Sequence, residues 1–173
     1  MRNIINPRNI FVLCVLIFAA STRIIKHPDN FTAIGAMGLF AGAVMSSRAM
    51  SLLASFAVMF ATDAMLGFYE GFWIVYIAFA LSIVTGWIIS KKQNVGSITI
   101  ASLISALLFF IISNFGVWTG PMYAHTYAGF MQCYSAALPF FWNGLASQFV
   151  YGAILFGGYH LLRVYKPTLI RVK

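Results

Sequence analysis

The chain has 173 residues, of which 61% are apolar or aromatic and only 8% are charged. A soluble domain carries about 25% charged residues, so this composition excludes a soluble enzyme and a disordered chain and indicates a membrane protein. The net charge is +8, yet almost no water-facing surface remains to bind nucleic acid, and two cysteines, Cys14 and Cys133, are too few for a disulfide scaffold.

Six apolar stretches approach the roughly 20 residues that a helix needs to cross a bilayer. They cover residues 9–25, 30–46, 50–69, 72–90, 97–118 and 143–162. Short polar turns separate most of them, which is typical of antiparallel neighbouring helices. The sequence therefore predicts an all-α membrane protein, a compact bundle of six transmembrane helices that forms a single domain over residues 1–173.

Residues 1–21 also resemble a secretory signal, with Arg2 and Arg8 near an apolar run and small side chains at Ala19 and Ser21. We expect this segment to be retained as the first helix, because every other stretch is a stable span. Cleavage would not change the orientation of the rest of the chain.

Residues 119–142 are long enough to cross the membrane but contain no Lys or Arg, so charge has to decide the number of crossings. With six spans and a cytoplasmic N-terminus, the basic residues on the inside are Arg2, Arg8, Arg48, Lys91, Lys92, Arg163, Lys166, Arg171 and Lys173. A seventh crossing would move the last four outside, against the positive-inside rule. We therefore predict that both termini lie on the cytoplasmic side of the membrane. Residues 119–142 become an outer-face segment, re-entrant or interfacial, between the fifth and sixth helices.

Asp63 is an acid within the outer half of the third predicted helix, about 9 Å from its end at Tyr69 for a rise of 1.5 Å per residue. A charged carboxylate in a membrane requires an inward-facing position and a partner. Glu70 shares its helix face, and Arg23 and Lys26 are the outer-face cations that either acid would meet. Two interpretations stay open for Asp63, a substrate-contacting acid and a structural ion pair.

Amide and aromatic side chains gather on the same outer side. The amides, which both donate and accept hydrogen bonds, are Asn114, Gln132, Asn143 and Gln148. The aromatic residues that would cover a ligand are Trp118, Tyr123 and Tyr127. An apolar cavity with a few polar groups is typical of a small-molecule site. An aromatic belt at the membrane interface is the alternative.

The second apolar stretch has small residues along one narrow face. Gly35, Gly38 and Gly42 follow one another at helical spacing. Small residues let helix backbones approach closely in lipid, so this face is expected to pack against another helix of the chain, with a helix of another subunit as the alternative.

Metal and enzyme signatures are weak. His27, His125 and His160 do not have the spacing of metal ligands, so no metal or cofactor is expected. The sequence also lacks a nucleophile elbow, a zinc-protease motif and a phosphate-binding glycine loop, and we expect no enzymatic activity.

Two resemblances follow from these features. The stretch NFTAIGAMGLFAGA over residues 30–43, with TDAMLGF over 62–68 and SNFGVW over 113–118, is similar to a family of small bacterial integral membrane proteins of unknown function. Six short helices with a glycine-rich second helix and a ligand-suited outer face also resemble the substrate-binding S components of energy-coupling-factor vitamin transporters. That resemblance implies a small-molecule ligand and, as partners, a coupling transmembrane subunit and cytosolic ATPases.

The leading hypothesis is an integral membrane substrate-binding or transport protein for uptake of a small, vitamin-like nutrient. The residues expected to contact the ligand are Asp63, Asn114, Trp118, Tyr123, Tyr127, Gln132, Asn143 and Gln148. Two alternatives remain: a structural or assembly membrane protein without a ligand, and a membrane enzyme or haem or metal protein.

Overall fold

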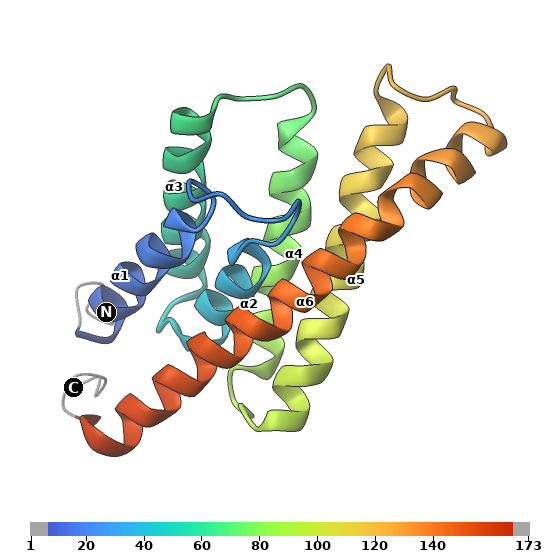
Figure 1. Cartoon of the computed structure of the whole chain (residues 1–173). Helices are drawn as coiled ribbons and strands as arrows, with labels where there is room; N and C mark the ends of the chain where they lie inside the picture. The colour runs from blue at the N-terminus through green and yellow to red at the C-terminus, as the bar shows by residue number, and fades with distance from the viewer. Residues whose placement is uncertain (1–6, 168–173) are drawn as a thin grey trace.

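The computed structural model describes residues 7–167, which fold into a bundle of helices with no strand among them (Figure 1). The helices are α1 (Pro7–Ser21), α2 (Ile34–Val44), α3 (Arg48–Leu66), α4 (Phe72–Ile89), α5 (Val95–Thr119) and α6 (Tyr127–Tyr165). Both ends of the described chain lie at the same end of the bundle. The predicted all-α class and the six helices are therefore confirmed.

Four of these helices, α3 to α6, are long and apolar enough to cross a membrane. The other two are shorter, with 15 residues in α1 and 11 in α2. At 1.5 Å per residue these two reach about 22 and 16 Å, less than the roughly 30 Å of a hydrocarbon core. The chain is thus a membrane protein with four candidate spans among its described residues, whereas six crossings and the side that each terminus faces stay predictions.

The longer helices carry their apolar side chains on the outside. Helix α5 is the clearest case, because its buried residues are only Ala101, Ser102 and Ser105. Large apolar side chains on the same helix, such as Val95 and Ile100, are exposed. A soluble helix would show the reverse arrangement, so these exposed faces are suited to contact with lipid.

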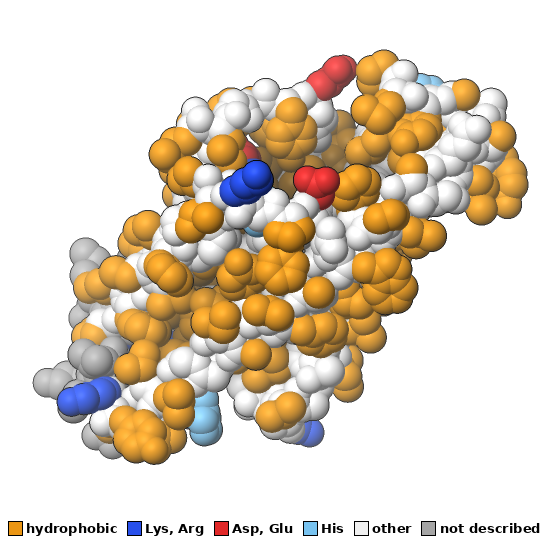
Figure 2. All heavy atoms as spheres, in the orientation of Figure 1, with side chains coloured by type: hydrophobic (Ala, Val, Ile, Leu, Met, Phe, Trp, Pro, Cys, Tyr) orange, Lys and Arg blue, Asp and Glu red, His pale blue; other side chains and the backbone are white. Residues whose placement is uncertain are grey.

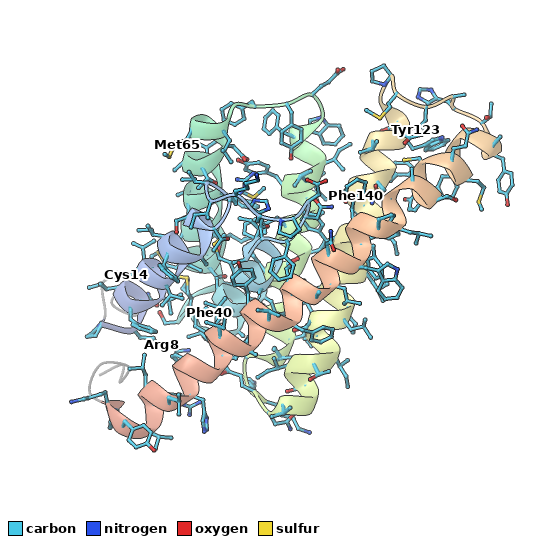
Figure 3. The ribbon with its side chains drawn as sticks, viewed as in Figure 1. Arg8, Cys14, Phe40, Met65, Tyr123 and Phe140 are labelled. Atoms are coloured by element: carbon cyan, nitrogen blue, oxygen red, sulfur yellow. The ribbon has the colours of Figure 1, made fainter. Side chains whose placement is uncertain are left out.

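Helix α2 is the buried centre of the bundle and contacts each of the other five helices. A Cβ atom at Gly42 would collide with the backbone carbonyl of Ile83 on α4, and one at Gly86 would collide with the carbonyl of Leu39. Only glycine therefore allows the two backbones to lie this close together. Phe40 completes the centre with an edge-on ring contact to α6 and is labelled in Figure 3.

The prediction of a separate re-entrant or interfacial segment between the fifth and sixth helices is wrong over most of its length. Helix α5 continues to Thr119, only residues 120–126 form a loop, and residues 127–142 are the first part of the 39-residue helix α6. Pro139 lies inside this helix, where its missing N–H removes one backbone hydrogen bond without ending the helix. The length of this stretch is compatible with a helix, and the positive-inside rule led to the error, because a seventh crossing would have moved the last four basic residues outside.

The two ends of the bundle differ in charge. One end carries the loops 22–33, 67–71 and 120–126 and all three acids of the sequence, Asp29, Asp63 and Glu70; we call it the acidic end. The other carries the turns 45–47 and 90–94 and the first residues of α1; we call it the basic end. Its described basic residues are Arg8, Arg48, Lys91, Lys92, Arg163 and Lys166.

Candidate functional site

The acidic end contains a cavity of about 480 Å³. Its wall is built by all four long helices together with α2 and the loop after α1. A hollow with basic and acidic side chains near its rim is visible at this end in Figure 2. The volume lies within the range of about 300–1,000 Å³ that is usual for small-molecule pockets.

An ion pair closes one side of this cavity. Arg23 lines the cavity, and its Nη2 lies 2.5 Å from Oδ1 of Asp63, whose side chain is 1% exposed. The guanidinium also donates a hydrogen bond of 2.6 Å to the hydroxyl of Thr62. This hydroxyl in turn donates to the carbonyl of Met59. Asp63 therefore has the partner that a buried acid needs, and it holds the loop after α1 against α3.

Helix α4 and the loop before it complete the environment of the ion pair. The hydroxyl of Tyr76 donates a hydrogen bond of 2.8 Å to Oδ2 of Asp63, so both carboxylate oxygens are engaged. Tyr69, in the loop between α3 and α4, lines the cavity. Burial, and then the carboxylate of Asp63, raise the pKa of this phenol above its usual value, partly offset by Arg23. Tyr69 consequently remains a neutral hydrogen-bonding group across the physiological pH range.

Aromatic rings from the two last helices form the opposite wall. Phe109 and Phe110 on α5 and Phe140 and Phe141 on α6 line the cavity. The rings of Phe110 and Phe141 lie 4.8 Å apart between centroids and are tilted, which fixes their positions relative to each other. The wall suits a flat apolar molecule.

Two buried polar side chains of the cavity wall have no partner. Gln148 on α6 is 3% exposed and Ser105 on α5 is 1% exposed, and both line the cavity. Neither Nε2 of Gln148 nor the hydroxyl of Ser105 forms a hydrogen bond within the described part of the chain. A buried polar atom without a partner costs about 1–3 kcal/mol, so the wall presents groups that are suited to a bound molecule.

The predicted ligand residues divide into two groups. Asn114 and Gln148 line the cavity, and Asp63 lies behind Arg23. The amide of Asn114 donates a hydrogen bond of 2.8 Å to a backbone carbonyl of its own helix. Asn143 does not line the cavity; its amide donates to the backbone carbonyl of Asp29, 3.1 Å away, and so joins α6 to the loop after α1.

The other predicted ligand residues lie on the outer part of the α5–α6 hairpin, away from the cavity lining. Tyr123 is at the tip of this hairpin in Figure 3, and Tyr127 is 80% exposed. The side chain of Gln132 is exposed as well. Trp118 donates a hydrogen bond to the carbonyl of Ala124 and stabilises the loop. The structure does not bring these four predicted residues into the site.

The predicted outer-face charges and packing glycines lie in different environments. The outer-face charges Lys26 and Glu70 are exposed, in contrast to Arg23. A Cβ atom at Gly38 would collide with the ring of Phe79, so this glycine, like Gly42, faces α4. No group of three or more His, Cys, Asp or Glu side chains within residues 7–167 is arranged to hold a metal ion.

Several residues of the site were not recognised in the sequence. Tyr76 is an isolated polar residue near the start of an apolar helix, and Thr62 directly precedes Asp63 near the end of another, so position beside a turn or an acid is their only signal. Ser105 carries a clearer signal, because serine within a helix of this apolarity is expected to face the protein interior. Phe109 and Phe110 carry no signal, since Phe is equally suited to lipid contact.

Comparisons with known proteins give one match. The model of a family described as a family of unknown function (DUF6580) matches residues 3–169. No curated protein and no solved structure matches the chain, so neither comparison supports the resemblance to S components.

Proposed function

The chain belongs to DUF6580, a family of unknown function, and from the site we propose that it binds a small organic molecule in the cavity at the acidic end. The observation that carries this proposal is the amide of Gln148, which is buried in the cavity wall and whose Nε2 has no hydrogen-bond partner within residues 7–167. An acceptor atom of a ligand would supply the missing partner.

The cavity wall favours a particular ligand chemistry. It combines four phenylalanine rings with the hydroxyls and amides of residues such as Ser105, Asn114 and Gln148. The wall contains one permanently charged side chain, Arg23, whose charge is balanced by Asp63. A compact aromatic or heterocyclic molecule with hydrogen-bond acceptors fits such a surface better than a multiply charged ion does.

The proposed biological role is the uptake of a nutrient of this kind across the bacterial inner membrane. The cavity lies at one end of the bundle, where a substrate-binding protein would receive its ligand. The sequence contains no nucleotide-binding motif, so transport would be passive or would use the energy of a partner. A coupling transmembrane subunit with cytosolic ATPases is the partner that the resemblance to S components implies.

The test is native mass spectrometry of the full chain extracted gently from its own membrane. A bound small molecule that is released on unfolding supports the proposal. The matched variants are Gln148→Leu, which removes the unpaired amide, and Gln132→Leu, which changes an exposed glutamine on the same helix. We expect Gln148→Leu to lose the bound molecule and Gln132→Leu to retain it.

Two results would contradict the proposal. One is a protein that carries no small molecule after growth in rich and in minimal medium, and instead co-purifies with a stoichiometric protein partner, as a structural or assembly protein would. The other is a bound molecule whose occupancy is the same in both glutamine variants, since this molecule would lie outside the cavity.

A further inference from the structure

The basic end contains a second cavity, of about 410 Å³, which the first site does not involve. Side chains from three separate parts of the chain converge on it: the start of α1, the turn before α3 and the end of α4. Its polar and aromatic lining residues are Arg8, Ser46, Arg48, Trp87, Ser90 and Lys91.

Three positive charges therefore meet in one cavity, and none of them forms an ion pair within residues 7–167. The side-chain carboxylates of the sequence are those of Asp29, Asp63 and Glu70, which lie at the acidic end, and Asp63 is already paired with Arg23. The Nε of Arg8 is buried without a hydrogen-bond partner among the described residues. Like charges in a partly enclosed space repel one another unless an anion neutralises them.

The positions of these cations are fixed by the surrounding structure. The amide oxygen of Asn9 accepts hydrogen bonds from the backbone N–H and the hydroxyl of Ser46, which holds the start of α1 against the α2–α3 turn. The guanidinium of Arg48 lies 5.5 Å from the ring centre of Trp87, and the indole N–H of Trp87 donates to the hydroxyl of Ser51. The positive-inside rule explains why basic residues gather at one end, but not why they converge on a braced cavity.

We propose that this cavity binds a phosphate group, with Arg8, Arg48 and Lys91 as its charged ligands. Arg and Lys are the usual phosphate ligands in proteins, and an interfacial Trp suits the edge of a membrane. The phosphate belongs to an anionic phospholipid headgroup or to a free phosphate compound, because both present the same oxygens. This site is independent of the proposed small-molecule function.

The experiment is a thermal-unfolding titration of the full chain in neutral detergent. The added probes are phosphatidylglycerol, phosphatidylcholine, inorganic phosphate and glycerol phosphate. We expect phosphatidylglycerol to raise the unfolding temperature at lower concentrations than phosphatidylcholine. If inorganic phosphate and glycerol phosphate also raise the unfolding temperature at low concentration, the site binds free phosphate compounds. If only phosphatidylglycerol raises it, the lipid headgroup is the ligand.

Adjacent lysines provide the matched control, because Lys91 lines the cavity and Lys92 does not. Lys91→Gln should weaken the apparent affinity about fivefold for whichever probe raises the unfolding temperature. A fivefold change corresponds to the roughly 1 kcal/mol that one basic residue contributes to binding an anionic lipid surface. Arg8→Gln should act in the same direction, whereas Lys91→Arg and Lys92→Gln should retain the wild-type affinity. The proposal is overturned if no probe acts, if phosphatidylcholine stabilises the protein as strongly as phosphatidylglycerol does, or if Lys92→Gln loses as much affinity as Lys91→Gln.

Discussion

The side-chain amide of Gln148 on α6 lies directly over the Cα of Gly35 on α2, where a Cβ atom would collide with its Oε1. Both residues line the cavity at the acidic end. The glycine therefore positions the polar group on which the proposed ligand site depends, although it has no side chain with which to touch a ligand.

The first prediction concerns this contact. Gly35→Ala should displace the amide of Gln148 and reduce the occupancy of the co-purified molecule, while the chain still folds because the clash is with a side chain and not with backbone. Gly157→Ala is the control, since a Cβ atom at this helical position meets nothing within 4 Å. Native mass spectrometry of the two variants provides the measurement. Equal occupancy in both would show that the position of Gln148 does not matter for binding.

The second prediction separates a binding role of Gln148 from a structural one. Gln148→Leu keeps a similar side-chain volume and removes a buried donor without a partner, so the ligand-free protein should gain about 1–2 kcal/mol of unfolding free energy. Gln93→Leu should lose stability, because the Gln93 amide donates to the carbonyls of Ala43 and Ser90. Thermal unfolding in detergent, after removal of any bound molecule, measures both. A destabilised Gln148→Leu would mean that the amide supports the fold.

The sequence was sufficient to predict the helices whose limits are set by short polar turns. Helix α4, observed from Phe72 to Ile89, lies within one residue of its predicted limits, because Glu70 and Lys91 flank an uninterrupted apolar run. The first part of α6 was not predicted as part of the last helix, because the positive-inside rule disfavours a seventh crossing and no local pattern shows that the helix continues through Pro139.

The site was predictable to the extent that polar residues interrupt apolar helices. This rule placed Asn114 and Gln148 at the outer end, and both line the cavity. It had no means of excluding Tyr127, which lies on the same helix as Gln148 but more than five turns away from it, at 3.6 residues per turn. The sequence narrowed the partner of Asp63 to Arg23 or Lys26, but the choice of Arg23 depends on where the loop folds back, which no local pattern encodes.

The third prediction concerns the alkaline limit of stability. The pKa of Tyr69 lies above its usual value of 10.0, so just above pH 10 the folded chain keeps a proton that the unfolded chain loses. The unfolded state then binds fewer protons, and the free energy of unfolding falls as pH rises. Tyr69→Phe should reduce the fall in unfolding temperature between pH 9 and pH 11. The control Tyr127→Phe, at the exposed hairpin tip, should follow the wild type, and identical pH profiles for all three proteins would contradict the prediction.

The fourth prediction tests the ion pair by a double-mutant cycle. Asp63→Asn leaves the guanidinium of Arg23, which is 16% exposed, without its counterion and should cost about 3–5 kcal/mol of unfolding free energy. Arg23→Gln leaves the carboxylate with Tyr76 as its one hydrogen-bond donor among the described residues and should cost a similar amount. Lys26→Gln, an exposed cation on the same loop, should have no measurable effect.

The double variant decides between the two roles that the sequence left open for Asp63. With both charges removed, no buried charge is left unpaired, so much of the lost stability should return. If the folded double variant still carries the co-purified molecule, the pair serves the structure of the cavity wall. If it is folded but empty, Arg23 contacts the ligand and Asp63 holds its guanidinium in position. A purely additive cycle would show that the two side chains do not interact in the membrane-extracted protein.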